Sequence, residues 1–585
     1  MINNYKSFLK EYVKNNFPNY EFDQNKTTNK IKVACILDEF SYECFKYEGN
    51  FIQLGTNNWK KIIDNFKPDF LLVESAWQGL DRQWTYKIVN LHKHKNNTLP
   101  SLIKYCKEKK IPTVFWAKED PSDFEMFIEA AKLFDYIFTT DANSIKKYRE
   151  IVKHNKVYLL PFAAQPKIHN PINKDIMKVG NVAFAGSWYD KYPKRCADME
   201  IILKPAFKYD LVIFNRFKDM NVKHFSFPNE YRPYIKGSLN YEEIIKEYKK
   251  YNIFLNVNSV TNSPTTFSRR VFELLACGTP VISSYSKGIE NFFKDIVLMS
   301  KSKEETDKLI NTLLNNKEMR DKLAVLGIRE IFNHHTYGHR FNTILEKLNI
   351  ENPNKTKEGV SIITCTKRPN SLKNIISNYL RQVYPIKELI IVINKDSIDI
   401  DIWKEEVKKY KDVKIYKLPE NKSLGECLNF AIELSSYPYV SKFDDDDYYA
   451  PNYLIDMINA FKYTEAGVVG KLSVYGYLES NNSLVIRYPN YEHQYVGFVA
   501  GSTLTINKEI FKIVKFPHQS HGEDTDFLMR CKNKGIKVYS TDRFNHVVIR
   551  RANISSHSWQ ITEKNFMKNS KLVTTTKDYK PIITV

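Results

Sequence analysis

The chain has 585 residues, of which 43% are hydrophobic and 26% are charged, and its formal net charge is +21. This length exceeds what one hydrophobic core usually serves, so we expect three or four folding units. No stretch approaches the roughly 18 uncharged apolar residues of a membrane span, and the N-terminus lacks the apolar core of a signal peptide. These features predict a cytoplasmic protein. Peripheral contact with the anionic inner face of a membrane is a further expectation.

The distribution of charged residues and of cysteines limits the kinds of binding partner and metal site that we expect. The 88 Lys and Arg residues outnumber the 67 Asp and Glu residues, which suits an anionic partner, although a generally basic solvated surface explains the excess as well. Nucleic acid is not expected, because the basic residues form no dense Arg-rich tract and no RNA-recognition, zinc-finger or helix-turn-helix signature occurs. The eight cysteines lack CxxC spacing, which predicts reduced thiols without a zinc site or disulfides.

Short apolar runs alternate with longer amphipathic stretches, the rhythm of parallel α/β domains. The first half predicts strands in two series, at 31–37, 68–74, 111–116, 136–140 and 157–162, then at 179–186, 209–214, 253–258 and 279–284. A polar stretch with Pro353 predicts a linker. Beyond it, strands are expected at 360–365, 388–394, 413–418 and 439–444. No dinucleotide or P-loop motif interrupts the pattern.

These patterns predict three α/β units, the first two forming a lobed pair. The expected boundaries are 1–170 and 171–345 for the pair, 346–358 for the linker, 359–565 for the third unit and 566–585 for a C-terminal tail.

The motif KFDDDDYYAP, residues 442–451, places four carboxylates side by side after an apolar run. Neighbouring charges repel, so something must compensate them. Strand geometry would put Asp444 and Asp446 on one side, with Asp445 and Asp447 on the other. Ligands bind at the carboxyl ends of parallel strands, and carboxylates there suit Mg²⁺ or Mn²⁺ together with substrate phosphates. A solvated acidic turn is the alternative.

The second motif, HGEDTDFLMRCKNKG at 521–535, predicts a helix that ends near Gly535. Its buried face would carry Phe527, Leu528 and Cys531, and its first turn would carry Glu523, Asp524 and Asp526. Acidic residues in a first turn often serve only the helix dipole. A carboxylate that points into a cleft from this position can instead act as a general base.

Residues 360 to about 560 resemble glycosyltransferase family 2, which has the GT-A fold. The resemblance is carried, in order, by VSIITCTKRP, RQVYP (381–385), NKSLGECLNFAIE (421–433), FDDDDYYAP and GEDTDF. It implies a metal-dependent, inverting transfer of a sugar from a nucleotide diphosphate to a hydroxyl group. A base would take the acceptor proton, and Mn²⁺ or Mg²⁺ would stabilise the leaving diphosphate.

The resemblance also implies roles for individual residues. Asp446 matches the metal ligand, Asp444 a metal or sugar-nucleotide contact, Asp524 the catalytic base, and Glu523 a group that orients the base or the acceptor. The expected nucleotide-sugar contacts are Thr366, Asn394, Gly425 and Asp445, and the candidates for a further metal ligand are His546 and His557. Gly425 as an ordinary helix-start glycine, and each histidine as a structural residue, remain alternatives.

The first 345 residues resemble the CgeB-like, GT-B type glycosyltransferases associated with spore and cell-surface decoration. The segments that carry this resemblance include LDEFSYECF (37–45), PDFLLVESAWQG (68–79), IPTVFWAKEDPSDF (111–124), VAFAGSWYDKYPKR (182–195) and SPTTFSRRVFELLACGTPVISS (263–284). Glu273 takes the place of the carboxylate that faces the donor ribose in this fold.

Other residues of this half fit a donor site less completely. Arg269 and Arg270 would bind a diphosphate, and Gly186 would allow close phosphate approach. Thr265 stands where many GT-B enzymes carry an acidic residue, which leaves the activity of this half open. A structural ion pair is the alternative role for Glu273.

The sequence thus predicts an α/β protein in which a two-lobed GT-B Rossmann-like pair precedes a GT-A domain. Its expected activity is that of a nucleotide-sugar-dependent, hexosyltransferase-type enzyme acting on a surface glycan, glycolipid or glycoprotein, with both halves as candidate catalysts. In one alternative only the GT-A domain is catalytic and the GT-B half binds the acceptor. In a different class of function, the chain would be a non-catalytic carbohydrate-binding scaffold, or a metal-dependent nuclease, which would need a second metal site.

Overall fold

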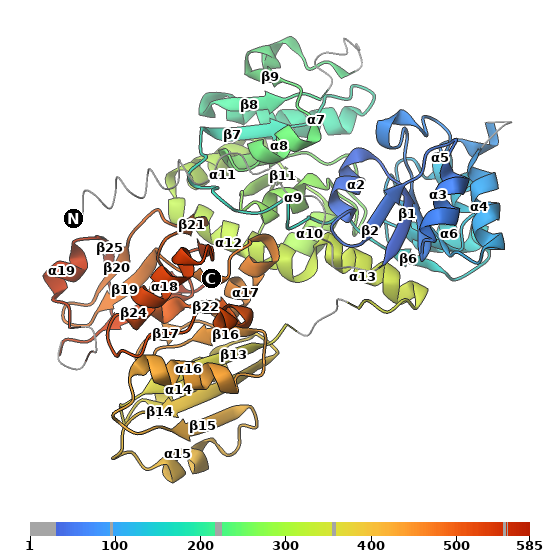
Figure 1. Ribbon diagram of the computed structural model, residues 1–585. Helices are drawn as coiled ribbons and strands as arrows, with labels where there is room; N and C mark the ends of the chain where they lie inside the picture. Colours follow the sequence, from blue (N-terminus) through green and yellow to red (C-terminus); the bar gives the residue numbers. More distant parts are fainter. Residues whose placement is uncertain (1–30, 94–97, 217–224, 354–357, 554–556, 558–559) are drawn as a thin grey trace. The chain divides into compact units, whose positions relative to one another are not determined.

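The computed structural model describes residues 31–93, 98–216, 225–353, 358–553, 557 and 560–585 (Figure 1). Residues 27–355 form one compact unit, and residues 356–585 belong to a second one. No helix in the described ranges is both long enough and apolar enough to cross a bilayer.

The first unit contains two six-stranded sheets, ordered β2-β1-β3-β4-β5-β6 and β12-β11-β10-β7-β8-β9. Every strand pair in both sheets is parallel. The strands are β1 (Lys32–Ile36), β2 (Asn50–Gln53), β3 (Phe70–Glu74), β4 (Thr113–Ala117), β5 (Tyr136–Thr139), β6 (Val157–Leu159), β7 (Gly180–Ala185), β8 (Leu211–Phe214), β9 (Ile235–Gly237), β10 (Tyr251–Asn256), β11 (Val281–Ser284) and β12 (Leu298–Ser300). The predicted parallel α/β pair is confirmed.

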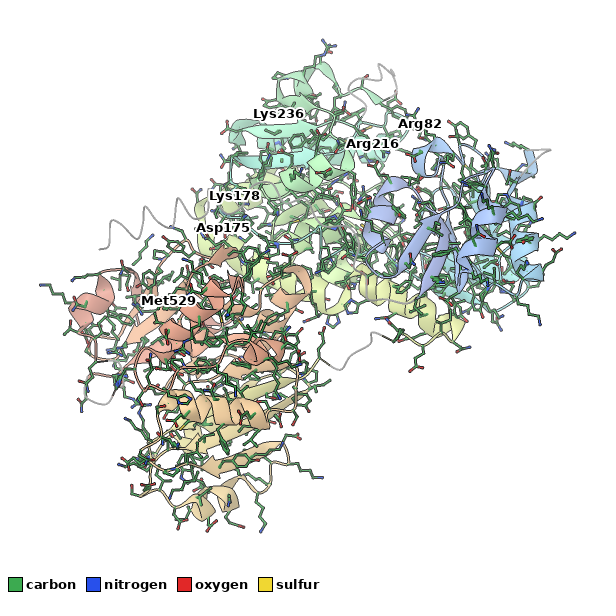
Figure 2. The ribbon with its side chains drawn as sticks, in the orientation of Figure 1. Arg82, Asp175, Lys178, Arg216, Lys236 and Met529 are labelled. Carbon is green, nitrogen blue, oxygen red and sulfur yellow. The ribbon has the colours of Figure 1, made fainter. Side chains whose placement is uncertain are left out.

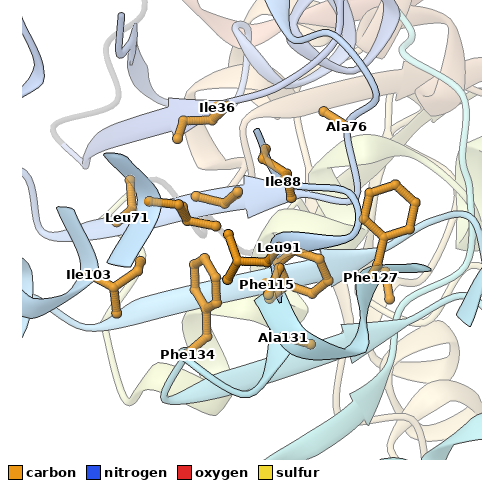
Figure 3. Packing of buried hydrophobic residues seen from close by; sticks show 14 of the residues in the cluster. Ile36, Leu71, Ala76, Ile88, Leu91, Ile103, Phe115, Phe127, Ala131 and Phe134 are labelled. Carbon is orange, nitrogen blue, oxygen red and sulfur yellow. The ribbon is translucent and has the colours of Figure 1, made fainter. Parts of the chain in front are cut away.

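Helices connect these strands and bury both faces of each sheet. They are α2 (Glu39–Phe45), α3 (Trp59–Phe66), α4 (Thr98–Glu108), α5 (Phe124–Ala131), α6 (Ser144–Val152), α7 (Pro193–Leu203), α8 (Tyr241–Glu247), α9 (Arg270–Ala276), α10 (Lys287–Phe293), α11 (Lys303–Asn315), α12 (Lys317–His334) and α13 (Tyr337–Leu348). On one face of the first sheet, Leu71 and Phe115 pack with Ile103 and Phe127 (Figure 3). Burial on both faces explains why these strands read as continuous apolar runs.

The segment that enters the second sheet is held by Lys178, which is labelled in Figure 2. Its ammonium group donates to the carbonyl of Tyr251 in β10. Burial, reinforced by the charge of Lys174, lowers the pKa of Lys178 to about 7. This contact anchors the chain just before β7.

Helix α13 corrects two predicted boundaries. Its buried residues Tyr337, Phe341, Ile344, Leu345 and Leu348 recur at helical spacing, and they pack in one cluster with residues of the first sheet. The chain therefore returns from the second subdomain to the first, so the predicted division at 171–345 assigns this helix to the wrong lobe. The predicted linker at 346–358 also starts inside the helix, because the apolar face continues to Leu348.

The second unit is built on an eight-stranded sheet ordered β15-β14-β13-β16-β22-β18-β23-β21. The strands β13 (Val360–Thr366), β14 (Lys387–Ile393), β15 (Val413–Lys417) and β16 (Tyr439–Lys442) are parallel, whereas β22 (Thr505–Asn507) runs antiparallel to β16 and to β18 (Val468–Gly470). The remaining strands of this sheet are β21 (Gln494–Val496) and β23 (Val538–Ser540). The four strands predicted from the sequence form one run of parallel neighbours, and β18 and β23 are a further parallel pair in the same sheet.

A second sheet of this unit has five strands, ordered β17-β24-β19-β20-β25. They are β17 (Tyr448–Tyr449), β19 (Val474–Leu478), β20 (Ser483–Arg487), β24 (His546–Arg550) and β25 (Ser570–Thr575). The helices of the unit are α14 (Leu372–Arg381), α15 (Ile400–Val407), α16 (Leu424–Leu434), α17 (Tyr453–Tyr463), α18 (Glu523–Asn533), α19 (Glu563–Met567) and α20 (Lys580–Ile583).

The segment predicted as a C-terminal tail, 566–585, is part of this unit. Strand β25 pairs antiparallel with β20. Ile583 is buried, and its carbonyl accepts a hydrogen bond of 2.8 Å from the backbone N–H of Asn545. The prediction was wrong because the short strand has little apolar alternation of its own and gains its stability from pairing with β20.

Replacing Phe341 by Ala should lower the free energy of unfolding of the first unit by about 3–5 kcal/mol, because a buried phenyl ring is lost from the packing of α13 on the sheet. Chemical denaturation monitored by circular dichroism measures this change. Glu346→Ala, on the exposed side of the same helix, is the matched control and should change it by less than about 0.5 kcal/mol. An equally small effect of Phe341→Ala would contradict the packing.

Candidate active site

The four aspartates lie in the turn between β16 and β17. Strand β16 ends at Lys442, before the acidic run, so the predicted alternation of the aspartates along a strand is wrong. The side chain of Asn374 holds the turn by donating to the backbone carbonyls of Asp445 and Asp447 at 3.0 and 3.1 Å. Because the backbone turns here, neighbouring carboxylates can face the same cation.

A cleft of about 510 Å³ opens at this turn, a size that suits a small-molecule ligand. It brings together most of the site residues predicted in this unit: Thr366, Asn394, Asp444, Asp445, Asp446, Glu523, Asp524 and His557. The side-chain amide of Asn394 donates to the carbonyl of Pro419 at 2.7 Å, which ties the end of β14 to the segment after β15 at the rim of the cleft.

Arg368 compensates two of the four aspartates. It follows β13 and forms ion pairs with Asp445 and with Asp446, the latter at 3.1 Å. Burial raises the pKa of Asp445 to about 6, with Asp446 adding to the effect and Arg368 opposing it. Arg368 was missed as a site residue, although a cation two positions beyond a parallel strand was the available signal.

His557 faces Asp446. Its Nδ1 lies 3.6 Å from Asp446 Oδ2, while its Nε2 accepts a hydrogen bond from the backbone N–H of Arg551. Burial opposes ionisation of Asp446, but the hydrogen bond with His557 and the charges of Arg368 and Arg551 outweigh it and lower the pKa.

The Asp446 and His557 pair fits a divalent cation whose other ligands come from a substrate. A carboxylate oxygen and an imidazole nitrogen are suitable donors for Mn²⁺, and Mg²⁺ sites often use one or two carboxylates with substrate phosphates. The described residues contain no group of three or more His, Cys, Asp or Glu side chains arranged to hold a metal by themselves.

His546 lies behind the cleft. It is fully buried, with Nε2 3.4 Å from Asp447 Oδ2 and 3.3 Å from Ser502 Oγ, and it is not among the lining residues. Burial, followed by the charge of Lys471, lowers the pKa of His546 to about 3, so the ring is neutral. The geometry therefore does not support His546 as a metal ligand, because its ring faces the carboxylate at the rear of the turn.

Helix α18 places the other carboxylates. Phe527, Leu528 and Cys531 are buried as predicted, and this face fixes the rotation of the helix. Glu523 and Asp524 consequently line the cleft. Asp526, from the same first turn, instead pairs with Arg530 at 2.9 Å on a more exposed side. Of the three acidic residues in the first turn of α18, Glu523 and Asp524 therefore face the cleft, whereas Asp526 does not line it.

Lys442 lies between the acidic turn and the carboxylate of Asp524 in α18. Its Nζ is 2.8 Å from Asp444 Oδ1 and 3.2 Å from Asp524 Oδ2. Burial raises the pKa of Asp524, while the positive charge of Lys442 opposes the rise. Burial and the negative charge of Asp524 raise the pKa of Glu523 to about 7. Lys442 was not predicted as a site residue, because a lysine that ends a strand is usually solvated.

The backbone at Gly501 makes room for Asp524. A Cβ atom at Gly501 would lie 1.9 Å from Asp524 Oδ2. Gly501 and its neighbour Ser502 line the cleft from a short 3₁₀ turn, Gly501–Thr503, rather than from a strand. The missing side chain thus allows the carboxylate to reach the cleft.

In the first unit, Glu273 is enclosed by protein groups. Its side chain is 2% exposed, and its two oxygens accept hydrogen bonds from Tyr241 and Tyr248 at 3.0 and 2.9 Å. Arg269 pairs with the same carboxylate and lies over the ring of Phe40, 4.1 Å from its centroid. This network matches the structural alternative for Glu273, because both oxygens are already bonded.

The other residues considered for this donor site lie in the second subdomain, where Arg270 Nε is buried without a hydrogen-bond partner in the described residues. Arg270 begins α9, and Gly186 follows β7, where a Cβ atom would lie 2.8 Å from the ring of Phe184. Thr265 donates to the carbonyl of Thr140 at 2.8 Å and accepts from the N–H of Ala142 at 2.9 Å. Its hydroxyl thus joins the two subdomains.

Comparison with known proteins agrees with this architecture. Residues 202–346 match the family model described as glycosyl transferase-like, and residues 361–532 match that of glycosyl transferase family 2. The chain carries a glycosyltransferase-like domain followed by a glycosyltransferase family 2 domain. The predicted succession of a GT-B type and a GT-A type module is confirmed.

Individual relatives match parts of the chain. The poly-beta-1,6-N-acetyl-D-glucosamine synthase of Staphylococcus epidermidis is 31% identical over 113 residues, which are 18% of this chain and 27% of that protein. An uncharacterized glycosyltransferase of Haemophilus influenzae is 26% identical over 195 residues, which are 32% of this chain and 76% of that protein. The chain thus spans about a quarter of the synthase, 27% of its length.

Among solved structures, S. aureus TarS residues 1–349 match at 16% identity with a TM-score of 0.27, covering 33% of this chain and 60% of that one. The same TarS fragment in complex with UDP-GlcNAc matches at 18% identity with a TM-score of 0.28, covering 36% of this chain and 64% of that one.

Gly425 serves the packing of the family 2 domain. It is buried near the start of α16, its N–H donates to the carbonyl of Gln519 at 3.1 Å, and it does not line the cleft. A Cβ atom there would lie 1.7 Å from the carbonyl oxygen of Pro517. The predicted nucleotide contact is therefore replaced by a close approach of two backbone segments.

Gly425→Ala should destabilise the family 2 domain by about 1–3 kcal/mol, because the backbone of Pro517 must move to accept the methyl group. Thermal unfolding measures the effect. Gly497→Ala is the control for added volume, since a Cβ atom there meets nothing within 4 Å and its backbone is not in the left-handed region. A Gly425→Ala protein as stable as the wild type would contradict the close packing.

Proposed function

We propose that the family 2 domain transfers a sugar from a nucleotide-diphosphate donor to a hydroxyl acceptor, with inversion at the anomeric carbon. The observation that carries the proposal is the common cleft of Asp446 and Asp524. One carboxylate lies beside His557 at a site suited to a cation, and the other projects from the first turn of α18. Donor activation and acceptor deprotonation need two such groups in one cavity.

Asp524 is the proposed base. Its Oδ1 is buried without a hydrogen-bond partner in the described part of the chain, so it has unused capacity to accept a proton. Burial raises its pKa, which favours base strength near neutral pH. Glu523, adjacent on α18, is proposed to orient the acceptor, while Thr366 and Asn394 form the wall proposed for the nucleoside.

Asp446 and His557 are the residues proposed to hold Mn²⁺ or Mg²⁺, and Asp444, from the same turn, is proposed to assist. When bound, the cation would stabilise negative charge on the departing diphosphate. Arg368 supplies positive charge to Asp445 and Asp446 and lines the same cleft, and we propose that it also binds anionic oxygens of the substrate.

The acceptor is proposed to be a surface glycan, a glycolipid or a glycoprotein. The synthase relative is named for a polymer of N-acetylglucosamine, which makes nucleotide-activated N-acetylglucosamine the first donor to test. The net charge of +21 suits work at the anionic cytoplasmic face of a membrane, which is the proposed location.

The bonding of Glu273 favours the alternative in which only the family 2 domain is catalytic. The carboxylate of Glu273 is bonded to two tyrosine hydroxyl groups and to Arg269, although a donor ribose would need the same oxygen atoms. Acceptor binding is then the role proposed for the first unit.

Asp446→Ala should lower metal-dependent sugar transfer by about a hundredfold or more, because charge stabilisation by a metal is worth several kcal/mol. Release of free nucleotide from a panel of nucleotide sugars, with and without Mn²⁺, measures this. Glu273→Gln in the full chain should leave transfer unchanged. Undiminished turnover by Asp446→Ala would contradict the metal assignment, and loss of transfer in a Glu273→Gln protein whose thermal unfolding matches the wild type would indicate a second catalytic centre.

Asp524→Asn should reduce kcat by about 10²- to 10⁴-fold, the contribution typical of a general base, while donor affinity changes little. Steady-state kinetics and calorimetric titration of the donor in the presence of Mn²⁺ measure the two quantities. Asp526→Asn, in the same helical turn but paired with Arg530, is the matched control and should retain kcat. Absence of any donor binding by the wild type would favour the non-catalytic scaffold.

A further inference from the structure

Lys442 is a buried cation inside an acidic cleft. Its side chain is only 7% exposed. Lysine ammonium groups are rarely buried unless they have ionic partners. Its Nζ contacts Asp444 Oδ1 at 2.8 Å, Asp524 Oδ2 at 3.2 Å and the carbonyl oxygen of Gly501 at 3.3 Å. These three acceptors fill the donor capacity of one ammonium group.

The charges around Lys442 are unbalanced. Asp444 from the turn after β16 and both Glu523 and Asp524 from α18 act on this position, while the turn at Gly501 contributes backbone alone. Strand β13 adds Cys365, a thiol whose pKa burial raises well above its usual value, so it stays neutral. One cation therefore faces three carboxylates. Removing it would leave Asp524 in a buried anionic cluster, where protonation is the favoured response.

We propose that Lys442 is a positioning residue that keeps Asp524 ionised and directed into the cleft, and this inference rests on the proposed function. The ammonium group also contacts Asp444 on the donor side, so one side chain fixes the separation between the donor carboxylates and the base. Lys442 touches no reacting atom in this role.

The pH dependence follows from the sign of the interaction. A cation within about 4 Å stabilises the ionised form of a carboxylate, and its loss raises the carboxylate pKa by about 1–3 units. Base catalysis requires ionised Asp524, so activity rises with pH through that pKa. Without Lys442, the acidic limb of the pH profile should move to higher pH.

The test compares Lys442→Met and Lys442→Arg with the wild type in the full chain. In the methionine variant, the acidic limb of kcat/KM for sugar transfer should shift upward by about 1–3 pH units, with activity recovering at high pH. The arginine variant keeps the charge and should retain most of the wild-type profile. A methionine variant whose limb stays in place, with kcat lowered equally at all pH values, overturns the inference.

A second measurement needs no turnover. The unfolding free energies of the wild type, Lys442→Met, Asp524→Asn and the double variant form a cycle. Their coupling should be present at pH 8, where Asp524 is ionised, and should decrease as the pH falls through its pKa. Additive effects at both pH values overturn the inference. If no nucleotide sugar is turned over but the coupling is found, the proposed function fails while the pairing stands.

Discussion

Compensation of negative charge organises the cleft of the family 2 domain. Two cations, Arg368 and Lys442, pair with four carboxylates: the first with Asp445 and Asp446, and the second with Asp444 and Asp524. At reduced dielectric, unpaired carboxylates at these distances would repel by several kcal/mol. The acidic turn can therefore be partly buried while it still presents oxygen atoms to a ligand.

The fold supplies both cations from neighbouring strand ends. β13 pairs directly with β16, so the segment after β13 brings Arg368 to the turn, and Lys442 is the last residue of β16 itself. Strand β22 pairs with β16 on its other side, and the short turn before it brings Gly501 against Asp524. The positions of Arg368, Lys442 and Gly501 around the cleft thus depend on the order of three adjacent strands.

Glu273, the buried carboxylate in the first unit, has a different environment from that of Asp524. Glu273 is ion-paired with Arg269 and bonded to two tyrosines, so its charge is balanced within the protein. In the cleft, by contrast, Asp524 keeps one buried oxygen without a partner in the described residues. A satisfied carboxylate stabilises a core, whereas an incompletely satisfied one retains the capacity to exchange a proton or bind a ligand.

The parallel strands, the buried face of α18 and the succession of two glycosyltransferase modules were predictable from the sequence, because they depend on local periodicity and on ordered motifs. It did not indicate that Lys442 contacts Asp524, that His557 lines the cleft while His546 lies behind it, or that Gly425 packs against backbone. Those assignments depend on contacts between residues far apart in the chain, such as Lys442 and Asp524. They became visible in the folded chain, because strand pairing determines which buried charges meet.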